Sequence, residues 1–303
     1  MRFTRFTLWQ YSWNNRRAIA SHAGLVDYMR RCAARPEAAY WLQNSVQAGV
    51  YPEGPDGGWR YKFEHLPVHD ELLQAYKLDE IAGQGDTFNR ALRLMDWFCA
   101  HTQYCGMEIR AAFRFQGKTE DSLRILRYAY DGGFRRAINC RHKAFVFADL
   151  CTACGMFAIP VALGSFTWRE GEADVDMPPC HFVVHVWLAE ERRWVMFDPS
   201  LNSYVTDGTN RALNLIEIHG HHIQGEHVAI AQYDFNGTQD CRETYLDNFI
   251  LNGLLELIVR SGTNRSGGPL ACLLPADVPP RDGKLRTITT AEFLAEPSMK
   301  EIA

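Results

Sequence analysis

The sequence predicts an α+β protein in which helices come first along the chain and an antiparallel sheet follows. Helical periodicity dominates up to about residue 155, and alternating apolar residues typical of strands dominate from there to about residue 200. Helices followed by strands, rather than a regular alternation of the two, are typical of this class. We divide the 303 residues into an N-terminal helical and strand extension (1–70), a core (71–260) and a loop-rich C-terminal tail (261–303).

Composition argues against several classes of protein. A net charge of −4 gives no electrostatic case for nucleic acid or an anionic membrane as a partner. No apolar run approaches the roughly 20 residues of a membrane span, and the basic N-terminus contains no apolar signal-peptide segment. The nine cysteines are scattered without framework spacing, so we expect mostly reduced thiols in a cytoplasmic protein.

The expected elements can be placed in chain order. A weak alternation suggests a strand at 2–9, and alternating aromatic residues predict another at 59–65. Apolar periodicity predicts helices at 23–33, 37–47, 71–81, 86–101 (capped by Asp86 or Thr87) and 120–130. After a helix that starts near Cys140, strands are expected at 157–166, 181–188 and 193–200, and helices at 244–259 and 290–294.

Three cysteines lie on the helix that begins at Cys140. Cys151 and Cys154 fall on an apolar face, near the C-terminal end of the helix and ahead of Gly155. The helix dipole has the wrong sign there for a redox C-x-x-C pair, and no second ligand pair supports zinc, so we interpret these two as core residues. Cys140 instead sits where a loop enters the helix, where free amides and the dipole stabilise a thiolate.

A base and an orienting acid for such a thiolate are found in the predicted hairpin. Strand alternation puts His181, His185 and Trp187 on one face of the first strand. Folding the hairpin about the polar loop 189–193 places Asp198 opposite or diagonal to His181. His185 has no carboxylate near it, so we select His181 as the base and expect His185 and Trp187 at most at the rim of a site.

The motifs NCRHKAFVFADLCTACGMFA and HFVVHVWLAEERRWVMFDPS, in this order, resemble the transglutaminase-like superfamily. Its members carry a helix-borne Cys, then a His-led strand, then a hairpin that ends in Asp-Pro, on a papain-like fold. The resemblance spans roughly 72–228 and includes an upstream helical segment that looks like the one in bacterial members. Residue by residue it makes Cys140 the nucleophile, His181 the base and Asp198 the orienting acid. The chain departs from the pattern at His185, where many relatives have Glu.

A triad of this kind performs acyl transfer without a cofactor. The Cys140 thiolate attacks an amide, ester or thioester carbonyl, and His181 protonates the leaving group. The Cys140 amide is one oxyanion donor, and Gln103 or Tyr104 is a candidate for a second by position alone. The acyl donor, free or bound to a peptide or carrier protein, then reacts with an amine or water. We favour amide-bond formation, because the added terminal segments and aromatic residues suit a dry pocket for a second substrate.

Two alternatives stay open. One is hydrolysis of an amide bond by a cysteine peptidase or amidase. The other is a non-catalytic module, including one that binds a metal through Cys180, His181 and the histidines of 219–227. That histidine tract has no acid or Cys at helical ligand spacing, and Gly220 and Gly225 are expected to mark loops. We therefore predict no metal site and expect the tract to line the acceptor side of the active site.

Overall fold

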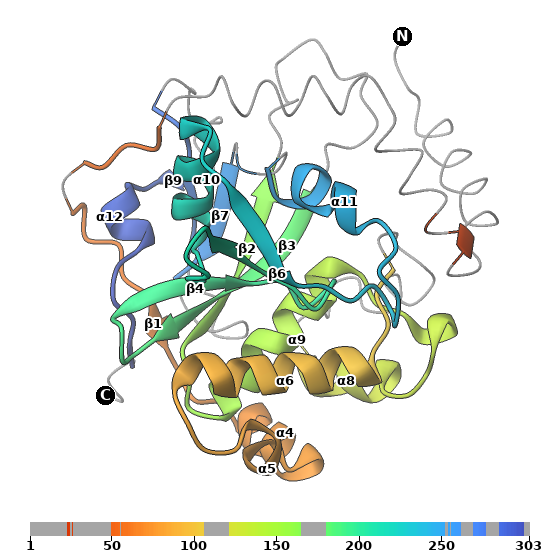
Figure 1. Ribbon diagram of the computed structural model, residues 1–303. Coiled ribbons are helices and arrows are strands. Elements are labelled where there is room, and N and C mark those ends of the chain that lie inside the picture. Colours follow the sequence, from red (N-terminus) through yellow and green to blue (C-terminus); the bar gives the residue numbers. More distant parts are fainter. Residues whose placement is uncertain are drawn as a thin grey trace, which may run out of the picture.

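Figure 1 shows a computed structural model of the protein. The structure describes residues 23, 24, 26, 50–54, 56–105, 121–164, 180–251, 254, 256–261, 269–276 and 285–299. Within these residues the fold is α+β, as predicted from the sequence. The predicted strand at 2–9 and nearly all of the predicted helices at 23–33 and 37–47 lie outside the described residues.

A helical layer precedes the sheet in the chain. Its members are α4 (Pro67–Tyr76), α5 (Leu78–Ala82), α6 (Thr87–His101), α8 (Ser122–Ala129), a 3-10 turn (Phe134–Arg136) and α9 (Cys140–Ala153). Asp86 caps α6 by accepting a hydrogen bond from the Asn89 amide, as predicted. The helix predicted over 71–81 is instead two helices, because Lys77 adopts a left-handed conformation that ends α4. Helix α9 contacts β2 and β3 on one side and α4, α6 and α8 on the other.

The main sheet has the strand order β4-β3-β2-β7-β8-β9. Its strands are β2 (Ala158–Gly164), β3 (Cys180–Leu188), β4 (Arg193–Phe197), β7 (Glu256–Arg260), β8 (Leu270–Leu273) and β9 (Arg286–Thr287). Each neighbouring pair is antiparallel except β8–β9, which is parallel. The tail beyond residue 260, predicted to be loop-rich, thus supplies two strands of this sheet.

Two small pairs of strands and several helices complete the described chain. Strand β1 (Lys62–Phe63) pairs with β10 (Ser298–Met299), and β5 (Tyr204–Asp207) pairs with β6 (Val228–Gln232). The helices are α10 (Leu215–Gln224), α11 (Arg242–Tyr245) and α12 (Thr290–Phe293), and the π-helical turn Leu246–Ile250 continues α11. Among the residues described, none of the helices combines the length and apolar character that a membrane crossing requires.

Two expectations in this region were wrong. The helix predicted over 244–259 ends at the π-helical turn, and its last residues form β7. Leu257 and Ile258 pair with β2 there, so sheet pairing overrides local helical propensity. Gly220, expected in a loop, lies inside α10. An Asn214–Glu217 capping box starts this helix, and Gly225 ends it in the left-handed conformation.

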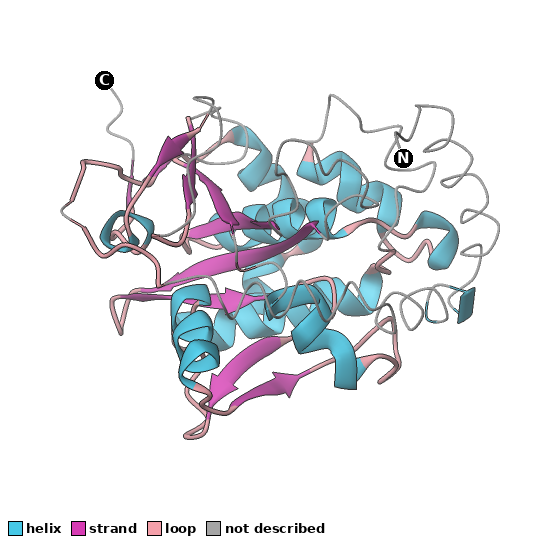
Figure 2. Ribbon diagram, turned by 90° about the horizontal axis from the view of Figure 1, so that it is seen from above, coloured by secondary structure: helices cyan, strands magenta, loops and turns pink. Residues whose placement is uncertain are grey.

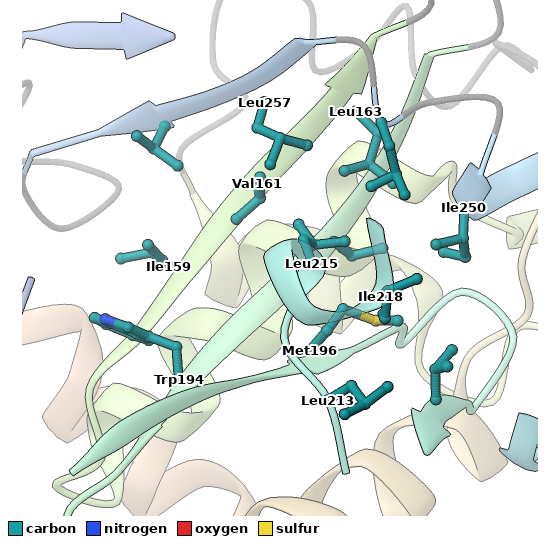
Figure 3. Close-up of a cluster of buried hydrophobic side chains, with 14 of the residues drawn as sticks. Ile159, Val161, Leu163, Trp194, Met196, Leu213, Leu215, Ile218, Ile250 and Leu257 are labelled. Atoms are coloured by element: carbon teal, nitrogen blue, oxygen red, sulfur yellow. The ribbon is translucent and has the colours of Figure 1, made fainter. Parts of the chain in front are cut away.

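The sheet separates two apolar cores. On one face, which α10 covers, side chains from β2, β4 and β7 meet α10 and the π-helical turn (Figure 3). On the other face, Val184, Val186 and Phe197 pack with α9 and the helical layer. Figure 2 shows helices on both sides of the strands. Strand alternation places His181 on the first face, so Cys140 on α9 has to approach it around the edge of the sheet.

Candidate active site

Cys140 is the first residue of α9, as predicted. The Asn139 side chain caps the helix by accepting a hydrogen bond from the His142 amide at 2.9 Å. Helix geometry leaves the amides of the first turn without intrahelical acceptors, and these amides and the dipole favour a negative charge at this end. The Cys140 side chain is half-buried. Its position therefore suits a reactive thiolate.

The other two cysteines of the opening motif are core residues. Cys151 and Cys154 are buried among the apolar side chains between α9 and the helical layer. Burial raises the pKa of the Cys151 thiol well above 9, and burial also raises the pKa of Cys154 to about 12. Both are therefore protonated near neutral pH, which confirms the interpretation of this pair as structural.

The hairpin brings His181 and Asp198 together. In the observed register His185 lies opposite Met196, and pairing ends where Phe197 faces Val184. Asp198 follows at once and reaches His181 diagonally, with 2.7 Å between His181 Nε2 and Asp198 Oδ2. Both side chains are buried. The predicted register, and with it the choice of His181 over His185 as partner of the acid, is confirmed.

Two further hydrogen bonds hold the Asp198 carboxylate. The Ser200 amide donates to its Oδ1 at 2.8 Å, and the Tyr245 hydroxyl donates to its Oδ2 at 3.0 Å. Ser203 Oγ in turn donates to the Tyr245 hydroxyl at 2.7 Å. The backbone of Asp198 pairs with Ser203 through two hydrogen bonds. This arrangement fixes the orientation of the carboxylate toward the imidazole.

His181 links the acid to the thiol. Burial disfavours the charged imidazole, but the charge and hydrogen bond of Asp198 and a hydrogen bond with Cys140 outweigh it and raise the pKa of His181 from 6.5 to about 10. Because Nε2 faces Asp198, Nδ1 is left for the Cys140 side chain. The three predicted residues therefore lie together, with the imidazole between the acid and the thiol.

The two predicted oxyanion candidates lie beside the start of α9. Tyr104 and Ile138 form a bridge in which the Cys105 amide donates to Ile138 at 2.9 Å and the Ile138 amide donates to Gln103 at 3.0 Å. The Asn236 side chain binds both backbone groups of Tyr104. Burial first, and then the charges of Cys140 and Asp198, raise the pKa of Tyr104 well above 10. Its hydroxyl therefore remains a donor close to Cys140, while Gln103 is half-buried on the same segment.

His185 and Trp187 are not brought to Cys140. His185 is fully buried, its Nε2 accepts from the Leu215 amide at 3.3 Å, and burial lowers its pKa to about 3. Trp187 lies opposite Trp194, and six residues along a strand from His181 correspond to about 20 Å. We expected these two residues at the rim of the site because they share a strand face with His181. That expectation was wrong, since both are buried in the core.

The histidine tract forms part of α10 rather than a loop. His219 packs against the Tyr51 ring with 4.6 Å between centroids, and His221 Nδ1 lies 2.5 Å from a carboxylate oxygen of Glu226. Within the described part of the chain, no group of three or more His, Cys, Asp or Glu residues is arranged to hold a metal ion. The expected role of the tract in lining the acceptor side stays a prediction.

Two site residues were missed in the sequence. Tyr245 binds Asp198, and Phe249 packs edge-on against His181 with 5.1 Å between ring centroids. Both come from α11 and the π-helical turn that follows it, and such turns occur frequently at functional sites. The sequence carries no motif for either residue, since their partners lie dozens of positions away.

Comparison with known proteins identifies no relative, because no family model, curated protein or solved structure matches this chain.

Proposed function

We propose that this protein is a cysteine acyltransferase of the transglutaminase-like type, with Cys140 as nucleophile, His181 as acid and base, and Asp198 as the residue that orients His181. The observation that carries the proposal is the buried His181–Asp198 hydrogen bond at 2.7 Å, with the half-buried Cys140 beside the imidazole at a helix N-terminus. A thiol paired with an oriented imidazole is the usual arrangement for nucleophilic catalysis by cysteine.

The geometry supports a two-step reaction. The Cys140 thiolate attacks the carbonyl carbon of an amide, ester or thioester, and the negative charge moves to the carbonyl oxygen. The Cys140 amide and the Tyr104 hydroxyl are our candidates to stabilise that oxygen, with Gln103 as the alternative. The His181 imidazolium then gives its proton to the leaving group, and a thioester remains on Cys140. In the second step His181 removes a proton from the acceptor, which attacks the thioester and releases the thiolate.

We favour an amine as the acceptor, so that the product is an amide. His181 and Asp198 are buried, at 4% and 0% exposure, and Phe249, Tyr245 and Tyr104 surround them. A dry surround of this kind reduces competition by water for the thioester. Hydrolysis by an amidase or peptidase uses the same residues and is the alternative. A metal-binding module is less well supported, because the described residues include no group of three or more His, Cys, Asp or Glu side chains placed to hold a metal ion.

The experiment that tests the proposal is mass spectrometry of the intact protein after incubation with acyl thioesters, esters and carboxamide peptides. We expect one acyl adduct, on Cys140, which is absent in Cys140→Ala and retained in Cys151→Ala. An adduct on another cysteine, or none with any donor, contradicts the assignment of the nucleophile. With a reactive donor, the ratio of amide to acid is then measured as the amine concentration rises. A product that stays an acid at saturating amine identifies a hydrolase.

A further inference from the structure

Lys143 lies one helical turn after Cys140 on α9, and its side chain is buried, with 1% exposure. No other lysine or arginine among the described residues is buried. Its Nζ donates to Thr102 O and to Thr102 Oγ1, both at 2.9 Å, and lies 3.8 Å from Cys99 Sγ. The ammonium also stands over the Phe98 ring at 4.7 Å from its centroid. Three acceptors for three N–H groups and a ring face fit a charged ammonium rather than a neutral amine.

Cys99 connects Lys143 to the triad without cancelling its charge. Cys99 Sγ donates to Pro199 O at 3.0 Å, and Pro199 directly follows Asp198. Burial raises the pKa of Cys99 to about 11, so its sulfur is a neutral thiol at physiological pH. Burial lowers the pKa of Lys143, and the charge of Asp198 is among the effects that oppose this shift. Asp198, whose charge acts on the ammonium, is fully buried, so we take it as the carboxylate that Lys143 offsets.

The charges of the site do not balance without Lys143. In the proposed reaction Cys140 acts as a thiolate beside an imidazolium, and with the Asp198 carboxylate the three charges sum to −1 in a largely buried region. Once the thioester has formed and His181 has given up its proton, Asp198 is the remaining charge of the triad. A buried ion without a counter-ion is costly, and lysine is almost never fully buried unless it is paired. A lysine at this position thus calls for a charged partner.

We propose that Lys143 is the counter-cation of the active site, which offsets the charge of Asp198 and stabilises the Cys140 thiolate. It acts as a positioning and electrostatic residue, through Asp198, rather than by contact with the substrate. This inference rests on the proposed function of Cys140.

Other charged and titratable groups also face this region. They come from α6 (Asp96, Cys99), the segment after it (Tyr104), β3 (His181) and the loops after β4 and β6 (Asp198, Asp234). All of these except His181 are acidic or neutral. Lys143 therefore supplies the positive charge that offsets them whatever the state of the imidazole.

The test is the pH dependence of Cys140 alkylation by iodoacetamide in the full chain, read by peptide mass spectrometry. In Lys143→Met we expect the midpoint for thiolate formation to move upward by roughly one pH unit, on the order of the effect of one nearby unit charge in a partly buried site. Below that midpoint the labelling rate falls about tenfold. Thr102→Val is the matched control, because it removes one hydrogen bond of Lys143 but keeps its charge, and its midpoint should not move.

Each outcome is informative. If wild-type Cys140 is not labelled ahead of the other cysteines, the proposed function fails. If it is labelled first and Lys143→Met has the wild-type midpoint, the inference on Lys143 fails while the nucleophile stands. If Thr102→Val shifts the midpoint as far as Lys143→Met, packing rather than charge is responsible, and the inference is overturned. Should Lys143→Met not fold, Lys143→Gln provides the same neutralisation with a polar side chain that can still bind Thr102.

Discussion

Tyr245→Phe isolates the hydrogen bond that holds Asp198 from α11. The hydroxyl donates to Asp198 Oδ2 at 3.0 Å and accepts from Ser203 Oγ at 2.7 Å, and all three residues are buried. A hydrogen bond to a charged group contributes about 1.5–3 kcal/mol, and its removal here also leaves the Ser203 hydroxyl without its acceptor. We therefore expect the free energy of unfolding to fall by about 2 kcal/mol.

The same change should slow acylation of Cys140. Asp198 keeps the Ser200 amide and His181 as partners, so the triad persists, but the carboxylate loses one of the contacts that fix its rotation. We expect a loss of about tenfold, equivalent to about 1.4 kcal/mol in the barrier. Burial, the largest effect, raises the pKa of Tyr245 well above 10, so the hydroxyl is a donor across the working range. The loss should accordingly be independent of pH between about 6 and 9.

Tyr233→Phe is the matched control for this prediction. Its ring lies 5.5 Å from that of Tyr245, but its hydroxyl donates to the Asp240 carbonyl rather than to the triad. Urea unfolding measures stability in both variants, and formation of the Cys140 thioester measures activity. We expect both variants to lose stability and only Tyr245→Phe to lose acylation rate. Equal rate losses in the two variants, or a wild-type rate in Tyr245→Phe, would refute the role assigned to this hydroxyl.

Four further predictions concern the triad and its surroundings. Limiting iodoacetamide should label Cys140 before Cys99, whose pKa is raised to about 11 by burial; faster labelling of Cys99 contradicts the assignment. Asp198→Asn should keep the fold, measured by circular dichroism, but lose at least about a hundredfold in turnover because the imidazole tautomer is wrong. His185→Ala should cost about 2–4 kcal/mol in stability yet leave the acylation rate within about threefold, since its ring is a core contact. Although burial opposes it, Asp198 raises the pKa of His181 from 6.5 to about 10, so its contribution to stability is complete below pH 6.5 and lost as pH rises through 10. Urea titrations of the wild type should show a fall on the order of a few kcal/mol over that window, which His181→Gln should lack.

The parts of the site that the sequence predicts are those set by local pattern. The Cys140 helix start follows from the Asn139 cap, and the partner of His181 follows from the length of one hairpin. Both depend on residues fewer than twenty positions apart, where strand alternation and turn length fix the geometry. The same alternation also placed His185 and Trp187 on the His181 face. Because β3 is nine residues long, however, one end of that face lies at the site and the other end lies in the core.

Residues whose contacts are with parts of the chain far away in sequence could not be predicted in this way. Tyr245 belongs to a segment whose sequence resembles one long helix, and pairing of the following residues with β2 ends that helix early. Lys143 lies on a helix that packs on both sides, so its polar side chain cannot find solvent. From helical periodicity alone, a lysine is expected on the exposed face of a helix. Whether a helix is covered on both sides depends on its tertiary contacts, so the burial of Lys143 could not be predicted from the sequence.

The Asp-Pro dipeptide explains why the acid stands where it does. Pro199 has no amide hydrogen and cannot continue the β-ladder, so the chain leaves the sheet directly after Asp198. Asp198 pairs with Ser203 instead of β3, and residues 180–183 of β3 are left without a β4 partner. His181 lies in this uncovered stretch, open to the carboxylate diagonally and to Cys140 from the end of α9. A longer β4 would cover that edge and separate the acid and the thiol from the imidazole. The residue that ends the strand therefore makes the site possible.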